Sequence, residues 1–489
     1  MFALYALLLL AFGLFVYSRL TSPLVKVPGP AYTIFTAAWL KYREFSRSRR
    51  LYIHGLHQRY GPVVRLGPNE VSFAGMDAMK EIYTSGGSGY DRTELYDLFR
   101  QFGTRTLFSM PPKADHSQRK RILADRYSNS NIMRPEILQG LEKRAGDFLS
   151  NCCNAPGSVA DVYVQLHCFA LDGASQHLFH PYGTNSLNDP EDFKLMQELS
   201  YHDSLRRESH PTCDDMILIV VEYLLKYYAP KLSALLQRLR FRRPKFVPLA
   251  NNYVLNACKK SNPSEISLLS RLQSKSAELE ALSAPAECMD HLAAGIDTTG
   301  DGLCFLMHQL SLPESQAIQA KLHQELVNNK DAPFDQLPYL DAVVKEGLRC
   351  FPPIPMSFPR YVPAGGRTLA GYFIPEKTIV SCQPFTLHKD ETIFPEPLEF
   401  KPERWLEPEG DSERNRMFFA FSQGSRGCLG KHLAMAEMKI LLQTVYSQCR
   451  TTISDQMHGS MELSDQIISS RPKDQTCKLV FEVCVQQCV

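Results

Sequence analysis

The chain has 489 residues, of which 44% are hydrophobic and 22% are charged, fractions that are ordinary for a globular protein with a sizeable core. This length accommodates one large domain or a few ordinary ones. The formal net charge of +2 gives no reason to expect a nucleic-acid partner. The 14 cysteines are scattered without the two short-spaced pairs typical of a zinc site, so we expect most of them to be buried in a reducing compartment.

The N-terminus carries an apolar run, residues 2–17, that contains no charged side chain. Its first basic residues, Arg19 and Lys26, follow the run, which lacks the basic start and small-residue cleavage site of a cleaved signal peptide. The sequence therefore predicts that residues 1–20 are a single-pass, uncleaved anchor in the endoplasmic reticulum membrane, with the rest of the chain in the cytosol. The proline-rich residues 21–30 are expected to form a stiff hinge.

The first half of the chain beyond the hinge has few chemical signals. Short β-like runs around a turn predict a hairpin over residues 61–73, and a loop rich in glycine and aromatic residues follows over 86–110. Residues 133–280 are helical in pattern. Within them, 216–228 predict a strongly apolar helix, and the basic run 238–245 is either a solvated loop or a contact with anionic lipid headgroups.

A long helix is predicted over residues 289–310, and its middle contains Gly295, Asp297, Thr298 and Thr299. A glycine inside a helix costs about 1 kcal/mol relative to alanine, and a threonine can bend a helix by bonding to the carbonyl four residues earlier. We therefore expect a local opening here, with room over a flat cofactor and polar groups beside it. The alternative is a threonine pair at an ordinary helix bend.

The next predicted helix covers residues 339–350, in which Glu346 and Arg349 share one face because they are three residues apart. Prolines force an extended path over residues 351–360. The last predicted β-segment is 477–484.

A cysteine among glycines, Cys428, stands just before a helix-like run that begins at Lys431. The helix dipole favours thiolate over thiol there, and a thiolate is a strong ligand for haem iron. The glycines let the backbone approach a flat group, and Arg426 is placed to pair with a haem propionate. The alternative is a buried cysteine at an ordinary turn between a loop and a helix.

Five positions of this stretch resemble the haem-binding signature of the cytochrome P450 family: Phe421, Gly424, Arg426, Cys428 and Gly430. The family's motifs occur in the same order over about residues 27–484. The resemblance implies a mainly α fold with small β-sheets (α+β), in which residues 31–489 form a haem-thiolate catalytic domain. It places haem b between the long central helix and the helix after the cysteine loop, with Cys428 as the axial ligand of the iron.

The resemblance also implies roles for residues outside the cysteine loop. Asp297 and Thr298 match the acid and the threonine that relay protons during oxygen activation in the family, which is suitable chemistry for a carboxylate and a hydroxyl. Glu346 and Arg349 match two members of a buried structural triad, and Arg404 matches its third member.

Further family contacts reach the haem propionates and the substrate. His116 and Lys120 stand where the family usually has a tryptophan and an arginine, and Arg360 matches another propionate contact; the alternative for all three is a solvated basic side chain. Residues implied as substrate-pocket candidates are Phe99, Phe102, Leu107, Phe108, Ala294, Ile354, Met356 and Phe358. Ordinary core packing is the alternative for the loop residues among them.

The function implied is that of a membrane-anchored monooxygenase, which inserts one atom of O2 into a C–H or C=C bond of a hydrophobic small molecule. No dinucleotide or flavin fingerprint is present, so electrons must come from another protein. The family implies an NADPH-cytochrome P450 reductase, for which the predicted basic docking residues are Arg119, Arg121, Arg126, Lys431 and Lys439.

Two alternatives to this function remain open. The first is a reductase-independent haem-thiolate isomerase or dehydratase, although such members usually lack the acid–threonine pair. The second is a non-catalytic haem-binding or ligand-binding membrane protein. The overall pattern resembles filamentous-fungal members that act in secondary-metabolite biosynthesis on polyketide, terpenoid or peptide scaffolds.

Overall fold

The computed structural model describes residues 2–84, 89–200, 247–276 and 282–484. The predicted apolar helix at 216–228 and the basic run that follows it lie outside these residues. Helices dominate the described chain and four small sheets accompany them, which confirms the predicted mainly α fold with small β-sheets.

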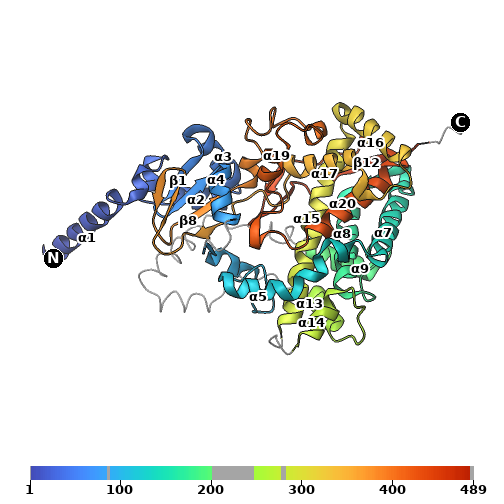
Figure 1. Cartoon of the computed structure of the whole chain (residues 1–489), viewed down its shortest axis with the longest axis horizontal. Coiled ribbons are helices and arrows are strands. Elements are labelled where there is room, and N and C mark those ends of the chain that lie inside the picture. The colour runs from blue at the N-terminus through green and yellow to red at the C-terminus, as the bar shows by residue number, and fades with distance from the viewer. Residues whose placement is uncertain (1, 85–88, 201–246, 277–281, 485–489) are drawn as a thin grey trace.

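The helical part is built around α15 (Ser283–Ser311), which packs along α8 (Val162–Phe179). Figure 1 shows α15 passing through the middle of the helices, beside α8 and α20. Apolar side chains such as Leu292, Leu303 and Leu310 of α15 are fully buried, so this helix forms the centre of the largest hydrophobic core. Other helices of this part include α7 (Pro135–Cys153), α13 (Pro248–Cys258), α14 (Leu268–Ser274), α16 (Gln316–Asn328), α17 (Pro338–Cys350) and α20 (Lys431–Tyr446).

Glycines set the spacing between α15 and α8. A Cβ on Gly295 would lie 2.9 Å from the Cβ of Ala174, and one on Gly300 would lie 3.0 Å from the ring of His167. Only glycine leaves room for this close approach. The helix α15 is continuous, so the predicted local opening is wrong, and Gly295 serves helix packing instead.

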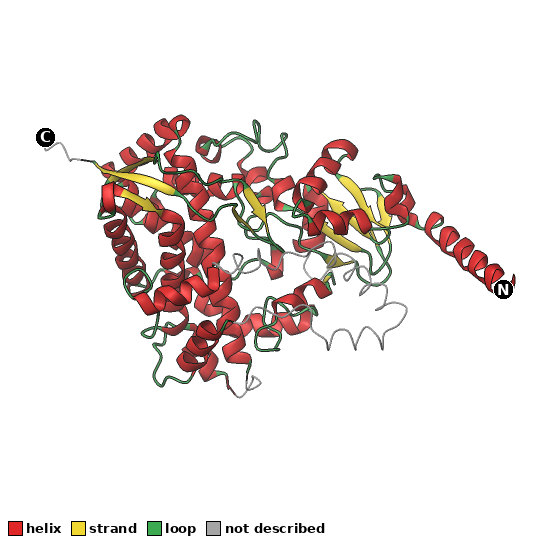
Figure 2. Ribbon diagram, turned by 180° about the vertical axis from the view of Figure 1, so that it is seen from behind, coloured by secondary structure: helices red, strands yellow, loops and turns green. Residues whose placement is uncertain are grey.

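The strands form one five-stranded sheet and three smaller sheets. The larger sheet has the order β1-β2-β8-β5-β3, and β1 and β2 form the hairpin predicted at 61–73, with Val63 opposite Phe73. Figure 2 shows this sheet toward α1 and the three-stranded sheet β4-β12-β9 at the opposite end of the molecule. The strands are β1 (Val63–Gly67), β2 (Glu70–Phe73), β3 (Asp91–Arg92), β4 (Val159–Asp161), β5 (Arg360–Tyr361), β6 (Arg367–Leu369), β7 (Tyr372–Ile374), β8 (Ile379–Cys382), β9 (Cys449–Ile453), β10 (Leu463–Asp465), β11 (Ser470–Pro472) and β12 (Lys478–Val483).

Shorter elements complete the described chain. The remaining α-helices are α1 (Phe2–Leu20), α2 (Ala38–Phe45), α3 (Arg49–Tyr60), α4 (Met76–Met79), α5 (Lys113–Leu123), α6 (Asn129–Ile132), α9 (Pro190–Ser200), α18 (Pro384–Leu387) and α19 (Asp411–Met417). Two short helical turns border the cysteine loop, namely η3 (Lys80–Thr84) and η11 (Gly424–Arg426).

The predicted anchor is the helix α1, whose apolar side chains, including Leu8 and Leu10, are exposed. Judged on the described residues alone, no helix has both the length and the apolar character that crossing a membrane requires. The predicted transmembrane span is therefore not supported.

The segment 21–30 is fastened to the five-stranded sheet by Arg65 of β1. The Arg65 guanidinium donates to the carbonyl oxygens of Leu24 and Val27, each at 2.8 Å, and its backbone N–H donates to the carbonyl of Pro28 at 2.7 Å. These contacts explain why the proline-rich segment follows one path over the sheet.

Candidate active site

Cys428 lies between η11 and the first residue of α20, Lys431, as its sequence position predicts. The backbone N–H of Cys428 donates to the carbonyl oxygen of Phe421 at 2.8 Å, which closes the loop. The Cys428 side chain is exposed, although most cysteines of the described chain are buried. Cys428 is therefore a solvent-exposed residue at the N-terminal end of a helix, where the dipole favours an anion.

Opposing influences act on the pKa of Cys428. Although the residue is exposed to solvent, the many protein atoms around it desolvate the thiol and raise its pKa. A hydrogen bond from the Gly430 backbone and the charges of Lys120 and Lys431 lower the same pKa. A metal ion bound to the sulfur would deprotonate it outright. The surroundings thus contain the groups that stabilise a thiolate ligand.

The two signature glycines at this loop meet different requirements. Gly424 has a φ of 70°, and a Cβ there would lie 2.0 Å from the carbonyl oxygen of Tyr83 in η3. Gly430 has room, since its nearest neighbour would be a ring carbon of Tyr127 at 4.0 Å. The close approach at Gly424 is therefore to the protein's own backbone.

Three arginines, Arg92, Arg360 and Arg426, form a buried group that we call the arginine cluster, and His116 of α5 lies beside it. Burial and the charges of Arg360 and Arg426 lower the pKa of Arg92 to about 9. Burial and the charge of Arg360 lower the pKa of Arg426 to about 10. Burial and the neighbouring arginines lower the pKa of His116 to about 2, so this ring is neutral.

The arginine cluster has more positive charge than its protein partners neutralise. Within the described chain, Arg92 Nε and His116 Nδ1 are buried without a hydrogen-bond partner. Arg426 donates mainly to backbone carbonyls, and the carboxylate of Asp91 is 3.9 Å away from it. A haem carries two propionates that would neutralise such a cluster, and Cys428 offers the thiolate, so the residues present fit this cofactor.

Arg92 is a residue that sequence reasoning missed. Its guanidinium lies 4.6 Å from the ring centre of Tyr96, and it belongs to the cluster only because β3 pairs with β5, the strand that carries Arg360. Its signal in the sequence is an arginine at the start of an aromatic-rich loop. Lys120, which sequence reasoning placed at a propionate, donates to the carbonyl of Ser425 at 2.8 Å and so braces the cysteine loop.

The helix α15 presents its two predicted catalytic residues in different directions. Thr298 Oγ1 donates to the carbonyl of Ala294 at 2.7 Å, the bond expected of a helical threonine. Ala294 is exposed in the middle of this otherwise buried helix, and Thr298 is half-buried one turn later on the same face. Asp297 instead pairs with Arg471 of β11, with 3.3 Å between the carboxylate oxygen and the guanidinium nitrogen.

Two carboxyl groups of α15 lie against the end of the aromatic-rich loop, at residues 106–108. Glu287 accepts from the backbone N–H of Leu107, at 3.0 and 3.1 Å to its two oxygens. The Thr106 side chain and the backbone of Phe108 lie next to Asp290 and lower its pKa. Burial raises the pKa of Glu287 to about 8 and that of Asp290 to about 7. Neither acid was recognised in the sequence, because helical acids are usually exposed.

The pocket candidates differ in their surroundings. Leu107 is part of the main core, and Phe358 packs against Phe419 at 5.8 Å between ring centres, so the alternative of core packing describes these two. Phe108 contacts Phe99 edge to face at 5.2 Å. Met356 is buried, whereas Phe99, Phe102, Phe108 and Ile354 are half-buried and Ala294 is exposed.

Several predicted docking residues face inward. Lys439 is buried and pairs with Asp341 at 2.7 Å, and Arg119 lies 3.4 Å from buried Glu287. Arg126 is half-buried and donates to the carbonyl of Ser267 at 3.2 Å. The predicted docking role is therefore wrong for Lys439 and Arg119, because both side chains contact acids of the protein's own interior. Arg121 and Lys431 are exposed.

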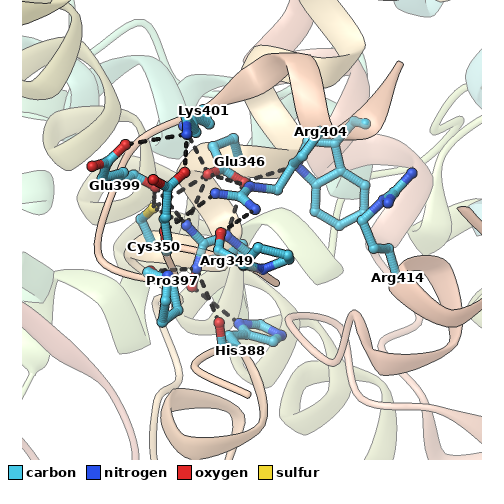
Figure 3. Close-up of polar contacts among 12 residues, drawn as sticks. Glu346, Arg349, Cys350, His388, Pro397, Glu399, Lys401, Arg404 and Arg414 are labelled. Atoms are coloured by element: carbon cyan, nitrogen blue, oxygen red, sulfur yellow. Dashed lines mark hydrogen bonds and ion pairs between the residues drawn. The ribbon is translucent and has the colours of Figure 1, made fainter. Parts of the chain in front are cut away.

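The structure brings the three predicted triad residues together. Glu346 accepts from Arg349 through both oxygens at 2.8 Å, and Arg404 Nε donates to the same carboxylate at 3.0 Å. Figure 3 shows both guanidinium groups directed at Glu346. Trp405 Nε1 and the backbone N–H of Lys401 also donate to it, each at 2.9 Å, so the buried charge is fully hydrogen-bonded.

Comparison with known proteins agrees with this geometry. A model of the family described as Cytochrome P450 matches residues 27–478. The chain is 28% identical over 490 residues to the cytochrome P450 monooxygenase stcB of Emericella nidulans, with 94% of this chain and 89% of that protein covered. It is 27% identical to cypX of Dothistroma septosporum and to aflV of Aspergillus parasiticus, both named cytochrome P450 monooxygenases, with 94% of this chain and 91% of each relative covered.

The exposed cysteine before α20, the arginine cluster and a family match across most of the chain lead to one conclusion. The family uses haem, molecular oxygen and electrons supplied by a redox partner. This chain belongs to the cytochrome P450 family and is a monooxygenase of that family.

Proposed function

We propose that this enzyme inserts one atom of O2 into a C–H or C=C bond of a hydrophobic small molecule, with haem b held by Cys428. The observation that carries the proposal is the exposed Cys428 thiol at the start of α20, close enough to Lys120 for that charge to lower its pKa. When bound, a thiolate-ligated haem supplies the oxygen-activating chemistry.

The protein's own residues then have distinct tasks. The arginine cluster orients the cofactor by pairing with its propionates, and Lys120 braces the cysteine loop. The Thr298 hydroxyl lies on the face of α15 where Ala294 is exposed. Its hydrogen is donated to the Ala294 carbonyl, and its oxygen can accept a hydrogen bond from a proton donor. Asp297, which is adjacent in sequence, serves as the acid that supplies protons to that face.

Electrons reach the enzyme from an NADPH-cytochrome P450 reductase in this proposal. The exposed side chains of Arg121 and Lys431 are the docking candidates, since acidic partners are attracted to uncompensated basic groups. The exposed leucines of α1 favour attachment of the enzyme to the endoplasmic reticulum membrane, where such a reductase would lie beside it.

The substrate is proposed to be an intermediate of fungal secondary metabolism. The support is the similarity over nearly the whole chain to relatives from Emericella, Dothistroma and Aspergillus. Half-buried aromatic side chains of the loop, such as Phe99 and Phe108, suit an apolar ligand.

A two-part experiment tests the proposal. The carbon monoxide spectrum of the reduced protein should show a thiolate-ligated haem, and Cys428→Ser should abolish that band. Metabolite extracts are then incubated with enzyme, reductase and NADPH, and products gaining one oxygen atom from ¹⁸O2 are identified by mass spectrometry. A histidine-type spectrum, or turnover that needs neither NADPH nor reductase, would contradict the proposal.

A further inference from the structure

Half-buried Asp297 belongs to a group of four charged side chains contributed by three elements, and the other three side chains are buried. One Asp297 oxygen lies 3.3 Å from a guanidinium nitrogen of Arg471, and the other oxygen lies 3.9 Å from Nε2 of His167. The same Nε2 is 3.5 Å from a carboxylate oxygen of Asp301. His167 is fully buried on α8, and Asp301 is 1% exposed on α15.

The hydrogen bond at the other ring nitrogen restricts the protonation of His167. Its Nδ1 lies 2.7 Å from the backbone carbonyl oxygen of Tyr163, which can only accept, so Nδ1 carries a hydrogen. Nε2 faces the oxygens of Asp297 and Asp301. A bare nitrogen lone pair directed at two carboxylates would be repelled, whereas an N–H is attracted to both.

Charge neutrality supports the same protonation. When both are ionised, Asp297 and Asp301 contribute two negative charges, and Arg471 contributes one positive charge. A protonated His167 balances the group, and a neutral ring would leave one uncompensated negative charge in the core, which costs several kcal/mol.

The influences on the pKa of His167 also favour a protonated ring. Burial lowers the pKa of His167, but the hydrogen bond and charge of Asp301 and the charge of Asp297 outweigh it and raise the pKa overall. The pKa of Asp301 is raised by burial and lowered by His167 and Arg471, with the burial effect larger. The other titratable groups that face this site are the side chains of Tyr163 and Cys304.

We propose that His167 is a positioning residue for Asp297: as a doubly protonated imidazolium it holds, together with Arg471, the Asp297 carboxylate in one position. The inference rests on the proposed function, because it assumes that Asp297 serves the oxygen chemistry. Arg471 attracts one carboxylate oxygen from the β11 side, and His167, which is itself paired with Asp301, attracts the other from α8.

The protonation state is tested directly on the full-length holoenzyme by nitrogen NMR. [¹⁵N]Histidine-labelled wild type and His167→Gln are compared as their reduced carbon monoxide forms, which are diamagnetic, and the difference gives the signals of His167. We expect both ring nitrogens to be protonated at pH 7.5, above the ordinary histidine value of about 6.5. A difference signal from a neutral ring with one bare nitrogen would overturn the proposal.

The positioning role is tested by the pH dependence of oxygen use with reductase and NADPH. His167→Gln removes the positive charge that lowers the pKa of Asp301 and attracts Asp297, so the acid limb of the profile should move upward by about one pH unit. His308→Gln, the same change at a half-buried position later in α15, should leave the profile in place. Arg471→Lys keeps the charge and should retain the wild-type limb.

Two outcomes separate this inference from the function on which it rests. Superimposed pH profiles for wild type and His167→Gln, with equal NADPH-to-O2 ratios, would overturn the positioning role. If the wild type shows no thiolate-type carbon monoxide band, the proposed function fails, and NMR on the protein as purified still decides whether His167 is an imidazolium.

Discussion

The backbone N–H of Phe419 donates to Nε2 of His388 at 2.8 Å, while Nδ1 of the same ring lies 3.1 Å from the carbonyl oxygen of Arg349. Because Nε2 accepts, Nδ1 must carry the hydrogen and donate. Burial, with the charge of Arg349, lowers the pKa of His388 to about 3, so the ring keeps this neutral form. Figure 3 shows His388 beside Arg349. Through its bond with Phe419, His388 joins the triad helix α17 to the chain that leads into the cysteine loop.

Replacing His388 by alanine should loosen the cysteine loop. Two buried backbone groups, the Phe419 N–H and the Arg349 carbonyl, would lose their partner, at a cost of about 3 kcal/mol in total. We expect a lower thermal unfolding midpoint and a reduced thiolate-type carbon monoxide band. His432→Ala, at an exposed position of α20, should change neither. An unchanged band in His388→Ala would show that the loop is held without this ring.

The triad predicts a larger loss of stability. Glu346→Gln removes the carboxylate that neutralises Arg349 and Arg404, which are 0% and 5% exposed. A buried ion pair that loses one partner costs about 3–5 kcal/mol. Denaturant unfolding of the holoenzyme should show this loss. Glu191→Gln breaks an exposed pair with Lys194 and should cost less than about 1 kcal/mol. Equal losses in the two variants would contradict the assignment of the triad.

Gly424 and Gly146 should respond to alanine in opposite directions. Gly424→Ala places a methyl group 2.0 Å from the Tyr83 carbonyl oxygen at a φ of 70°, so we expect a loss of at least about 2 kcal/mol and poor haem incorporation. Gly146 lies in α7 with no atom near an added Cβ, and Gly146→Ala should stabilise the enzyme by about 0.5–1 kcal/mol. The ratio of haem absorbance to protein and the unfolding midpoint measure both effects.

Arg92 should contribute to haem retention. In Arg92→Gln one positive charge leaves the arginine cluster, and loss of a charged hydrogen bond of roughly 1.5–3 kcal/mol corresponds to haem release at least about tenfold faster. Transfer of haem to an excess of apomyoglobin gives the rate. Arg121→Gln, at an exposed position of α5, is the matched control and should release haem at the wild-type rate. Identical rates for the two variants would remove Arg92 from the site.

Glu287 should make stability depend on pH. Its pKa rises from an ordinary 4.5 to about 8 in the folded enzyme, so folding favours the protonated acid. The corresponding stability is fully present below pH 4.5 and is lost as the pH rises through about 8. Between pH 5 and 9, Glu287→Gln should therefore lose less stability than the wild type in thermal unfolding. Glu142→Gln, at an exposed position of α7, should follow the wild type. Parallel curves for wild type and Glu287→Gln would contradict the raised pKa.

Most of the sequence motifs that predicted structure correctly consist of residues that lie close together in the chain. The cysteine before α20, the i,i+3 pair of Glu346 and Arg349, and the hairpin at 61–73 each depend on neighbours close in the chain. Local spacing determines such contacts almost alone. The helix α15 was predicted nearly in full for the same reason.

What the sequence did not reveal depends on contacts between distant segments. Arg471 is 174 residues from Asp297, and nothing in the local pattern of either residue indicates their pairing. Gly295 suggested an open helix, but the structure shows that a glycine is needed there because Ala174 of another helix lies too close for a side chain. Likewise, a lysine is usually a surface residue, and only the structure shows that Lys439 is buried and paired with Asp341.

Side chains from other segments bind the loop segment 107–111 through its main-chain groups. Glu287 binds a backbone N–H, Arg92 binds the carbonyls of Leu107 and Phe108, and Arg426 binds those of Met110 and Pro111. Such bonds do not depend on side-chain identity. Substitutions of side chains in this segment should therefore leave its backbone in the same position relative to α15.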